Sequence, residues 1–486
     1  MKRSWTLART IGGGFVAVCL TGCVLVDPTD PYRPVPARQN PVAAARARFD
    51  TRQPVLPSPL TLKACIALAR ENNPDVGQAG WNVAIAGAEH AIAAGQRWPS
   101  LSVVGGYDHN LDNQRLIAPR STTDPGVFTR KVTSGELVLT MPIFTGGRIT
   151  SEIQAAQLLR EAADHRLTRT REELIFNVSS VFYGMLAQRH VISSIDFSNK
   201  ALEEHRQRVT DLVEVQKAAR VDLLRTQVRL ADLKQQRVRE NNVLAILQRV
   251  LINLLGVNDP SGQLEIEGEL TFEPVQADLP ASLDLAFARR ADYLAARAEV
   301  EAQARRVDAA RAVRWPEVSL RGSYGIRHAT DPAGQPRTTS TSDGKTSTTT
   351  PPEGDTTEDV GFFGVTAELP LFEGGRIMAR IRKERSALGA AQERLRKLEL
   401  QIRLDVQTAI LDIDAARERV VATQEAITQA RESLRIEREK YDLGRSSQTD
   451  VLDAQSALVD AETNYYRALA DYNTSRAELA LAVGDE

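Results

Sequence analysis

The chain has 486 residues, with 61 basic and 63 acidic side chains and a formal net charge of −2. Because the charges nearly cancel, the chain has no overall electrostatic field that would attract nucleic acid. No uncharged apolar run of about 20 residues follows the N-terminal segment, which excludes a transmembrane helix. A chain this long ordinarily indicates several domains, because single hydrophobic cores stop growing near about 250–300 residues.

The first 22 residues have the organisation of a secretion signal. Basic residues precede an apolar stretch from Ile11 to Leu20, which ends in the motif Leu-Thr-Gly-Cys at Cys23. Small residues before a cysteine resemble a bacterial lipobox. This predicts that residues 1–22 are removed and that Cys23 carries a diacylglycerol and an amide-linked acyl chain such as palmitate. Two such chains suffice for stable anchoring. The alternative is an ordinary signal peptide with an incidental cysteine.

Residues 23–60 are rich in proline and lack periodicity, which predicts an extended, lipidated tether. Val24 occupies the position where an Asp would favour retention in the inner membrane, so the outer membrane is the expected location. Cys65 is the only other cysteine of the mature chain and lies in an apolar helical pattern. We therefore expect a small core residue there rather than a nucleophile.

Two pairs of short motifs reveal an internal repeat. The segment 140–148 (TMPIFTGGR) returns in the second half of the chain as 368–376 (ELPLFEGGR). The sequence Arg-Trp-Pro at 97–99 returns at 314–316, at a slightly closer spacing. The chain is therefore predicted to contain two copies of one supersecondary unit, in which one connecting loop has grown by eleven residues. We place the repeats at 61–255 and 281–486, with a linker or equatorial region at 256–280.

Each repeat is predicted to contain two strands, because apolar and polar residues alternate there. The four strands are expected at about 100–108, 134–143, 317–327 and 360–371. Their length of about 9–11 residues is the span of a tilted transmembrane β-strand. Polar loops, at about 109–133 and 328–359, would join the strands of each pair. An edge hairpin on a soluble sheet is the alternative.

The second strand of each repeat leads into a helix through a proline and a Gly-Gly pair. Because glycine allows a sharp change of chain direction, these residues are expected to redirect the chain and to be structural. They are Pro142, Gly146 and Gly147 in the first repeat, and Pro370, Gly374 and Gly375 in the second.

About 65 residues without proline follow each Gly-Gly pair, and heptad spacing runs through them. The clearest rows are Ile413, Val420, Ile427, Leu434 and Tyr441, and then Val451, Leu458, Tyr465, Tyr472 and Leu479. This spacing predicts coiled-coil helical hairpins about 100 Å long. The hairpins would reverse near 213–222 and 441–450. Gly444 suits the end of a helix, whereas the first repeat has Gln216 there, which predicts a tip of different conformation.

Four strands cannot close a barrel, and an open sheet edge is not tolerated in lipid. Three copies would supply twelve strands, enough for an aqueous lumen. The predicted fold is that of an α+β membrane protein: a trimeric 12-stranded outer-membrane β-barrel, with four strands per chain, continued by a long periplasmic α-helical coiled-coil barrel and built from two internal structural repeats.

Taken together, the duplicated plan, the Pro-x-Phe-x-Gly-Gly-Arg turns, the Trp-Pro strand entries and the sequence Asp450-Val-Leu-Asp453-Ala-Gln resemble the TolC-type outer-membrane factor (outer membrane efflux protein) family. The resemblance covers essentially the whole mature chain, and the lipobox resembles the acylated branch of the family. It implies a homotrimer that is anchored in outer-membrane lipid of a Gram-negative bacterium and spans into the periplasm. Two departures are Gln216 and Arg290, which stands where the first repeat has an Asn-Pro helix break.

The resemblance also implies a closed periplasmic end with acidic rings, at Asp450 and Asp453, with Asp222 as the first-repeat counterpart of Asp450. Carboxylates around a narrow pore attract cations, although an Asp at a helix start also serves as an N-cap. The tips would contact a periplasmic membrane-fusion (adaptor) protein, unless they are simple αα-hairpin turns. The implied contact residues are Leu443, Gly444, Arg445, Ser446, Ser447, Val215, Ala218 and Ala219.

The implied function is a passive exit duct for small molecules and drugs, driven through the adaptor by an inner-membrane pump of the RND or ABC type. The alternative is the exit duct of a type I protein secretion system, and a soluble periplasmic scaffold or the adaptor itself is a remote one. The six histidines form no metal-binding i, i+4 pair, and no phosphate loop or nucleophile elbow is found. An enzyme, a cofactor, a metal site and a nucleic-acid partner are therefore not expected, and four methionines give heavy-metal efflux no support.

Overall fold

The computed structural model describes residues 59–117, 127–217, 219–258, 264–330, 339–342, 345–348 and 356–485. All of them belong to one compact unit, Pro57–Glu486. The predicted signal peptide 1–22, the lipid attachment site Cys23, nearly all of the tether 23–60 and the tip residue Ala218 lie outside the described residues.

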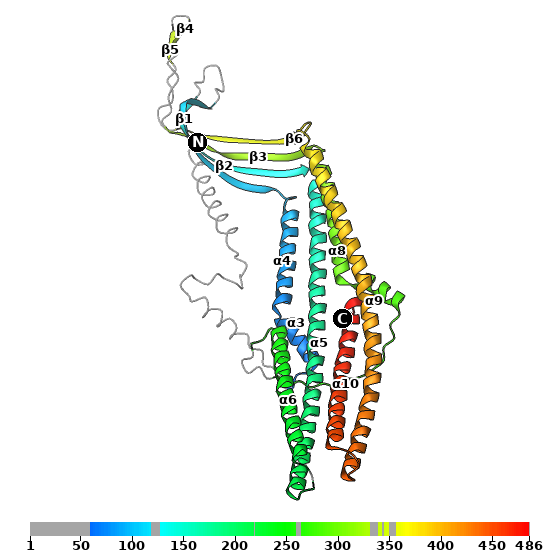
Figure 1. Ribbon diagram of the computed structural model, residues 1–486. Coiled ribbons are helices and arrows are strands. Elements are labelled where there is room, and N and C mark those ends of the chain that lie inside the picture. The colour runs from blue at the N-terminus through cyan, green and yellow to red at the C-terminus, as the bar shows by residue number, and fades with distance from the viewer. Residues whose placement is uncertain are drawn as a thin grey trace. The chain divides into compact units, whose positions relative to one another are not determined.

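The order of elements repeats along the chain (Figure 1). The first copy contains α3 (Leu62–Asn72), α4 (Pro74–Gly95), β1 (Ser100–Ile117), β2 (Val127–Phe144), α5 (Arg148–Glu214) and α6 (Arg220–Leu255). The second copy contains α7 (Leu279–Arg289), α8 (Ala291–Ala312), β3 (Glu317–Thr330), β6 (Thr356–Glu368), α9 (Arg376–Asp442) and α10 (Gln448–Val483). Between β3 and β6 lie the short strands β4 (Thr339–Ser342) and β5 (Lys345–Thr348).

The four long strands form one antiparallel sheet in the order β1-β2-β3-β6. The two copies pair in the same register: Leu101 lies opposite Leu139 in the first, and the residues at the same positions of the second, Val318 and Ala367, also lie opposite each other. The duplication therefore extends to individual backbone pairs.

The strands differ in extent from the prediction. β1 and β2 have 18 residues each, β3 has 14 and β6 has 13. Apolar alternation marks only part of a strand, whereas backbone pairing continues past it, so much of the expected loops 109–133 and 328–359 is strand. β4 and β5 also pair with each other inside the second loop. At the other end, β6 stops at Glu368, not at 371.

The long helices pack in pairs, α5 against α6 and α9 against α10, and α10 also packs against α5 (Figure 1). Both α5 and α9 have 67 residues. The predicted heptad positions supply much of the core: Ile413, Val420 and Tyr472 are at most 2% exposed and belong to one cluster. In the first copy the predicted row is Leu223, Leu230, Leu244 and Leu251, with Arg237 interrupting it. Arg237 is exposed and forms an ion pair with Asp196.

The segment between the copies packs on the helices. The hydroxyl of Tyr472 donates to the carbonyl oxygen of Glu273 at 2.5 Å and accepts from the amide of Val275 at 3.1 Å. Leu60 was expected in the extended tether, but it is 1% exposed and bridges to Ile266. The folded body therefore includes at least the last residue of the predicted tether, because Leu60 buries its side chain there.

Cys65 lies in α3 and is fully buried, as predicted for a core residue. Burial raises the pKa of its thiol to about 11. At neutral pH the thiol is therefore protonated, and a protonated, buried thiol is a poor nucleophile.

Each copy has a helix break at the same place, but different side chains hold it. In the first copy, Asn73 caps α4 through its side-chain oxygen and donates from Nδ2 to the carbonyl oxygen of Leu254 at 2.9 Å. In the second copy, Arg290 has nearly the same backbone angles and approaches the carbonyl oxygen of Ala482 at 3.5 Å. Both residues thus contact the C-terminal end of the returning helix, α6 or α10.

Arg290 is 2% exposed, and two carboxylates balance its charge. Its guanidinium donates to Asp292 at 3.0 and 2.7 Å and to Asp405 at 3.0 Å. Burial by itself would raise the pKa of Asp292, but the hydrogen bonds and charge of Arg290 outweigh it and hold that pKa below its ordinary value. An arginine can thus replace the Asn-Pro break only because this copy also carries the acidic partners.

Arg290→Ala is expected to lower the free energy of unfolding by about 2–4 kcal/mol. Breaking a fully buried pair costs about 3–5 kcal/mol, and Asp292 and Asp405 keep some solvent contact, which reduces the loss. Denaturant titration of the purified protein in detergent measures it. The control is Arg289→Ala, because the pair of Arg289 with Asp485 is exposed and should be worth less than about 1 kcal/mol. Equal losses in the two variants would contradict this role.

Candidate functional site at the turns and hairpin tips

The two strand–helix turns have the same backbone geometry. Gly146 and Gly147 have φ of 63° and 88°, and Gly374 and Gly375 have φ of 59° and 84°. The amide of Arg148 bonds the carbonyl oxygen of Thr145 at 3.1 Å, and Arg376 repeats this bond. Left-handed angles at both positions explain the Gly-Gly pairs.

The prolines of the two turns are placed differently. Pro142 lies inside β2, opposite Ser319, and the strand register shifts directly after it. Pro370 lies beyond the end of β6. Both prolines were expected at the strand–helix junction, inside the predicted strand ends at 143 and 371. Pro142 is tolerated within β2 because a proline near a strand end costs only one backbone hydrogen bond, whereas the shorter β6 leaves Pro370 outside the strand.

The surroundings of the glycines also differ between the copies. A Cβ added at Gly146 would lie 2.6 Å from the Cβ of Trp315, so the first turn packs tightly against the Trp-Pro entry to β3. A Cβ added at Gly374 would meet no described atom within 4 Å, and Trp98 is 71% exposed. In the described part of one chain, the Gly374 turn and Trp98 thus lack the turn–tryptophan contact that Gly146 and Trp315 make.

Both hairpin tips begin with the same helix ending, contrary to the prediction for the first copy. Gln216 has φ of 59°, a left-handed conformation like that of Gly444, whose φ is 69°. In each tip, the backbone amides of the two residues after the C-cap donate to carbonyl oxygens in the last turn of the helix. These residues are Gln216 and Lys217 in the first copy, and Gly444 and Arg445 in the second. The hydrogen bonds of the motif determine the conformation, and the glutamine adopts it at a conformational cost.

Gln216→Gly is therefore expected to stabilise the first tip by about 1 kcal/mol, because the left-handed conformation costs glycine nothing. Amide hydrogen exchange at Lys217 should slow by about fivefold. Gly444→Ala is the reciprocal variant and should speed exchange at Arg445. If Gln216→Gly speeds exchange instead, the greater freedom of glycine in the unfolded state outweighs the relief of strain.

The second tip is completed by a capping box at the start of α10. Ser447 is the N-cap, and the carboxylate of Asp450 accepts from the Ser447 amide at 2.8 Å and from the hydroxyls of Ser447 and Ser446 at 2.7 and 3.0 Å. These hydrogen bonds, with those of Ser447 foremost, lower the pKa of Asp450. The structure thus gives Asp450 a capping role.

The other two acidic residues lie at the same end of the hairpins. Asp453 is exposed and, among the described residues, forms no hydrogen bond or ion pair. Asp222, in the first turn of α6, lies 3.8 Å from Arg225, which in turn donates to Thr449 at 3.3 Å. Arg225 thus connects the start of α6 with the start of α10.

The expected tip contacts are open to solvent in the single chain. Leu443 is 71% exposed and Val215 is 61% exposed. Ala219 and Arg445 are also exposed. Ser446 is half-buried, and its single hydroxyl proton is shared between Glu437, at 2.6 Å, and Asp450.

A polar joint between the two hairpins, near the tips, was not anticipated from the sequence. Gln448 is 3% exposed, and its Nε2 donates to Thr226 Oγ1 at 3.0 Å and lies 2.6 Å from His205 Nε2. One heptad later, Gln455 donates to Ser198 Oγ at 2.7 Å. Two glutamines seven residues apart in a core row are the signal that would have revealed this joint.

The joint is expected to weaken in acid through His205. An amide nitrogen only donates, so His205 must accept through a neutral Nε2. Burial lowers the pKa of His205, the positive charges of Arg208 and Arg438 lower it further, and the negative charge of Asp442 raises it. The folded pKa thus lies below the unfolded value of about 6.5. The stabilisation is complete above pH of about 6.5 and is lost as the pH falls through the folded pKa.

Thermal unfolding at pH 7.5 and 5.0 measures this effect. The midpoint of the unmodified protein should fall more between these pH values than that of His205→Gln. The matched variant is His165→Gln. His165 also lies on α5, but it lies 3.9 Å from Glu161 of the same helix and is not part of the joint, so the variant should behave like the unmodified protein. An unchanged pH dependence in His205→Gln would assign the effect to another group.

Two other kinds of site are not found in the described part of the chain. Among the described residues, no group of three His, Cys, Asp or Glu side chains is placed to hold a metal ion. None of the described helices combines the length and apolar character needed to cross a membrane.

Comparison with solved structures identifies the fold. The chain is similar to VceC of Vibrio cholerae, with a TM-score of 0.69, 17% identity and coverage of 87% of this chain and 96% of that one. It is also similar to the CmeC outer membrane channel of Campylobacter jejuni, with a TM-score of 0.70, 17% identity and coverage of 87% and 85%. The open state of the Neisseria gonorrhoeae MtrE outer membrane channel gives a TM-score of 0.65, 19% identity and coverage of 87% and 89%. The fold is thus that of outer-membrane channels.

Comparison with protein families agrees with the fold. Residues 65–257 and 282–485 match the family described as Outer membrane efflux protein, which is more than half of the chain, in two copies. The chain belongs to the outer membrane efflux protein family. It is therefore an outer-membrane channel protein that extends into the periplasm, and not a member of an enzyme family.

Proposed function

We propose that three copies of the chain close into one twelve-stranded barrel and form a passive exit duct. The observation that carries this proposal is the four-stranded sheet with β1 and β6 as its two edges. An unpaired edge within lipid leaves backbone N–H and C=O groups without partners, each at a cost of several kcal/mol, and pairing β6 of one copy with β1 of the next removes both edges.

The duplication supports the same assembly. Within a chain, β2 pairs with β3 and the Gly146 turn packs on Trp315. Because the two repeats have the same plan, β6 should pair with β1 of the next copy in the way that β2 pairs with β3. The Gly374 turn should then pack on Trp98 of that copy. The open space at Gly374 and the exposure of Trp98 fit this contact.

The cargo proposed for the duct is small molecules, including drugs, delivered by an inner-membrane pump of the RND or ABC type through a periplasmic adaptor. The family's description as efflux proteins supports this choice over a type I secretion duct. We propose that the adaptor contacts the tips around Val215 and Leu443, and that Asp222, Asp450 and Asp453 line the constriction. We also propose a lipid anchor at Cys23, because an acyl anchor is consistent with the outer-membrane location of the family.

The test of function is deletion of the coding gene followed by complementation. Loss of the chain should raise intracellular accumulation of dyes and drugs, and the unmodified chain should restore their exit. Loss of a secreted protein with unchanged drug accumulation would favour the secretion duct instead. A photo-cross-linker at Leu443 would capture the adaptor. Leu443 is preferable to Ser447, because Ser447 caps α10 and its replacement would disturb the tip.

A further inference from the structure

The start of α9 carries a concentration of positive charge that the fold does not need. Residues 376–385 include five basic side chains and one acidic residue, Glu384. The corresponding residues of the first copy, 148–157, begin α5 after the same turn with one basic residue, Arg148, and one acidic residue, Glu152. Because α5 forms without the cluster, the turn and helix geometry does not account for it.

The basic cluster is solvent-exposed in the chain, and most of it is not neutralised. Arg376 forms an ion pair with Glu373 at 3.1 Å, and Lys383 lies 3.8 Å from Glu384. Among the described residues, Arg380, Arg382 and Arg385 form no ion pair. Their positive charge is therefore available to an outside partner. The basic cluster consists of Arg376, Arg380, Arg382, Lys383 and Arg385.

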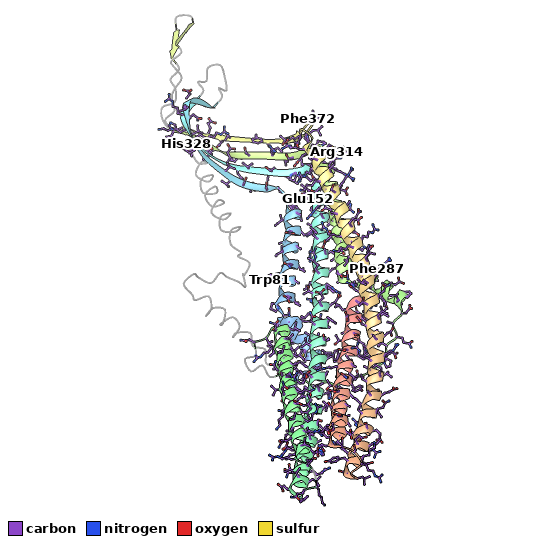
Figure 2. The ribbon with its side chains drawn as sticks, in the orientation of Figure 1. Trp81, Glu152, Phe287, Arg314, His328 and Phe372 are labelled. Carbon is purple, nitrogen blue, oxygen red and sulfur yellow. The ribbon has the colours of Figure 1, made fainter. Side chains whose placement is uncertain are left out.

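The basic cluster comes directly after the last apolar residues of the strand region that is proposed to face the membrane. Leu371 and Phe372 are 89% and 88% exposed, and Arg376 begins α9 four residues later. Figure 2 shows Phe372 and Arg314 at this end of the sheet, where the strands lead into the helices. The guanidinium of Arg314 contacts the sulfur of Met378, in the first turn of α9, at 2.7 Å.

Residues 376–385 span about 14 Å along a helix. The headgroup layer on each side of a bilayer is about 5–8 Å thick. With Phe372 at the edge of the hydrocarbon, the first turns of α9 therefore lie at the level of the headgroups and just beneath them. Arginine and lysine near an anionic surface contribute about 1 kcal/mol each, and their long side chains can reach up to the phosphates.

We propose that the basic cluster at the start of α9 binds the headgroups of anionic phospholipids in the periplasm-facing leaflet of the outer membrane. This inference rests on the proposed function only for the placement of the strands in the bilayer. It assigns a lipid-binding surface to one of the two turns: in a trimer, three such surfaces alternate with three starts of α5 that carry no net charge. The barrel then gathers anionic lipid at defined positions around its periplasmic rim.

The experiment is native mass spectrometry of the purified full-length protein, with phosphatidylglycerol and phosphatidylcholine of identical acyl chains offered in equal amounts. The test variant is the triple substitution Arg380→Gln, Arg382→Gln and Arg385→Gln. The matched control, Arg394→Gln, Arg396→Gln and Lys397→Gln, removes the same charge from exposed positions of α9 about 20 Å further from the sheet. The unmodified protein and the control should retain phosphatidylglycerol about tenfold over phosphatidylcholine, and the test variant should lose this preference.

Three results would overturn the proposal: no preference in the unmodified protein, an unchanged preference in the test variant, or a test variant that loses its oligomeric state, which would place the cluster against a neighbouring copy. Single-channel recording separates a further case, since altered ion selectivity with intact lipid preference would place the cluster in the lumen. Recording also separates this proposal from the proposed function. An unmodified protein that conducts ions but shows no lipid preference contradicts only the lipid site.

Discussion

A chain with cysteines at positions 107 and 365 is expected to form covalent dimers and trimers on mild oxidation, and no larger species. Tyr107 lies in β1 and Val365 in β6, the two edges of the sheet. In the proposed ring, β6 of each copy lies beside β1 of the next, so each of the three junctions would contain one Tyr107→Cys and one Val365→Cys.

The choice of this pair follows from the repeat. Leu137 of β2 lies opposite Tyr324 of β3. Val365 lies as far before its Gly-Gly pair as Leu137 does, and Tyr107 lies as far after its Trp-Pro motif as Tyr324 does. The registers of the two copies agree within the chain, so the same register is expected between chains. Opposed residues of antiparallel strands have Cα atoms about 4.5–5.5 Å apart, which is within the range of a disulfide.

The control pair is Val365→Cys with Val103→Cys. Val103 is on the same face of β1 as Tyr107 but four residues away, about 13 Å along the strand, so no disulfide should form. Both pairs are built in a Cys65→Ala background, which removes the buried thiol. Cross-linking by the control pair alone would show that the register is shifted, and a ladder beyond the trimer would indicate an open chain of subunits rather than a ring.

The features that the sequence predicted well are those that depend on backbone requirements. Gly-Gly turns, proline-free helices and heptad rows each reflect a local rule, and each was found at the expected place. The failures arose where several residues satisfy one requirement in different ways. Gln216 adopts the left-handed conformation that was expected only of a glycine. Arg290 replaces an Asn-Pro helix break with the help of Asp405, more than a hundred residues away in the chain.

The tip residues were the hardest to assign. The same position suits an N-cap and a pore carboxylate, and only the geometry reveals that the carboxylate of Asp450 is engaged by the backbone and hydroxyl of Ser447. The joint of Gln448 with His205 joins residues 243 positions apart in the chain. The two glutamines in one core row indicate a polar joint, but only the packing of α10 against α5 shows that His205 is the partner of Gln448.

The capping role of Asp450 changes how the proposed pore is best tested. Asp450→Asn removes a charge and also perturbs the cap, so its effect on conductance would be ambiguous. Asp453 lies one turn further along α10 and, among the described residues, has no hydrogen-bond or ion-pair partner. Asp453→Asn therefore changes the charge of the tip alone.

In planar bilayers, Asp453→Asn is expected to reduce the preference of the channel for cations by about two- to fivefold. A unit charge 4 Å from an ion contributes about 1 kcal/mol in water, which corresponds to about fivefold in ion occupancy, and a trimer loses three such charges around one narrow opening. Measurement of the reversal potential in a salt gradient gives the preference directly. Asp450→Asn should add a rise in leak conductance, because the start of α10 loses its cap and the closed tip is held less firmly.

Glu425→Gln is the matched control for charge. Glu425 is an exposed acidic residue of α9, about 26 Å along the helix from its tip, and its neutralisation should leave the reversal potential unchanged. If Asp453→Asn behaves like Glu425→Gln while Asp450→Asn still raises the leak, the carboxylates act on the closure of the tip and not on the ions that pass it. Asp450 would then keep its capping role, and the constriction would have to be formed by other side chains of the two tips.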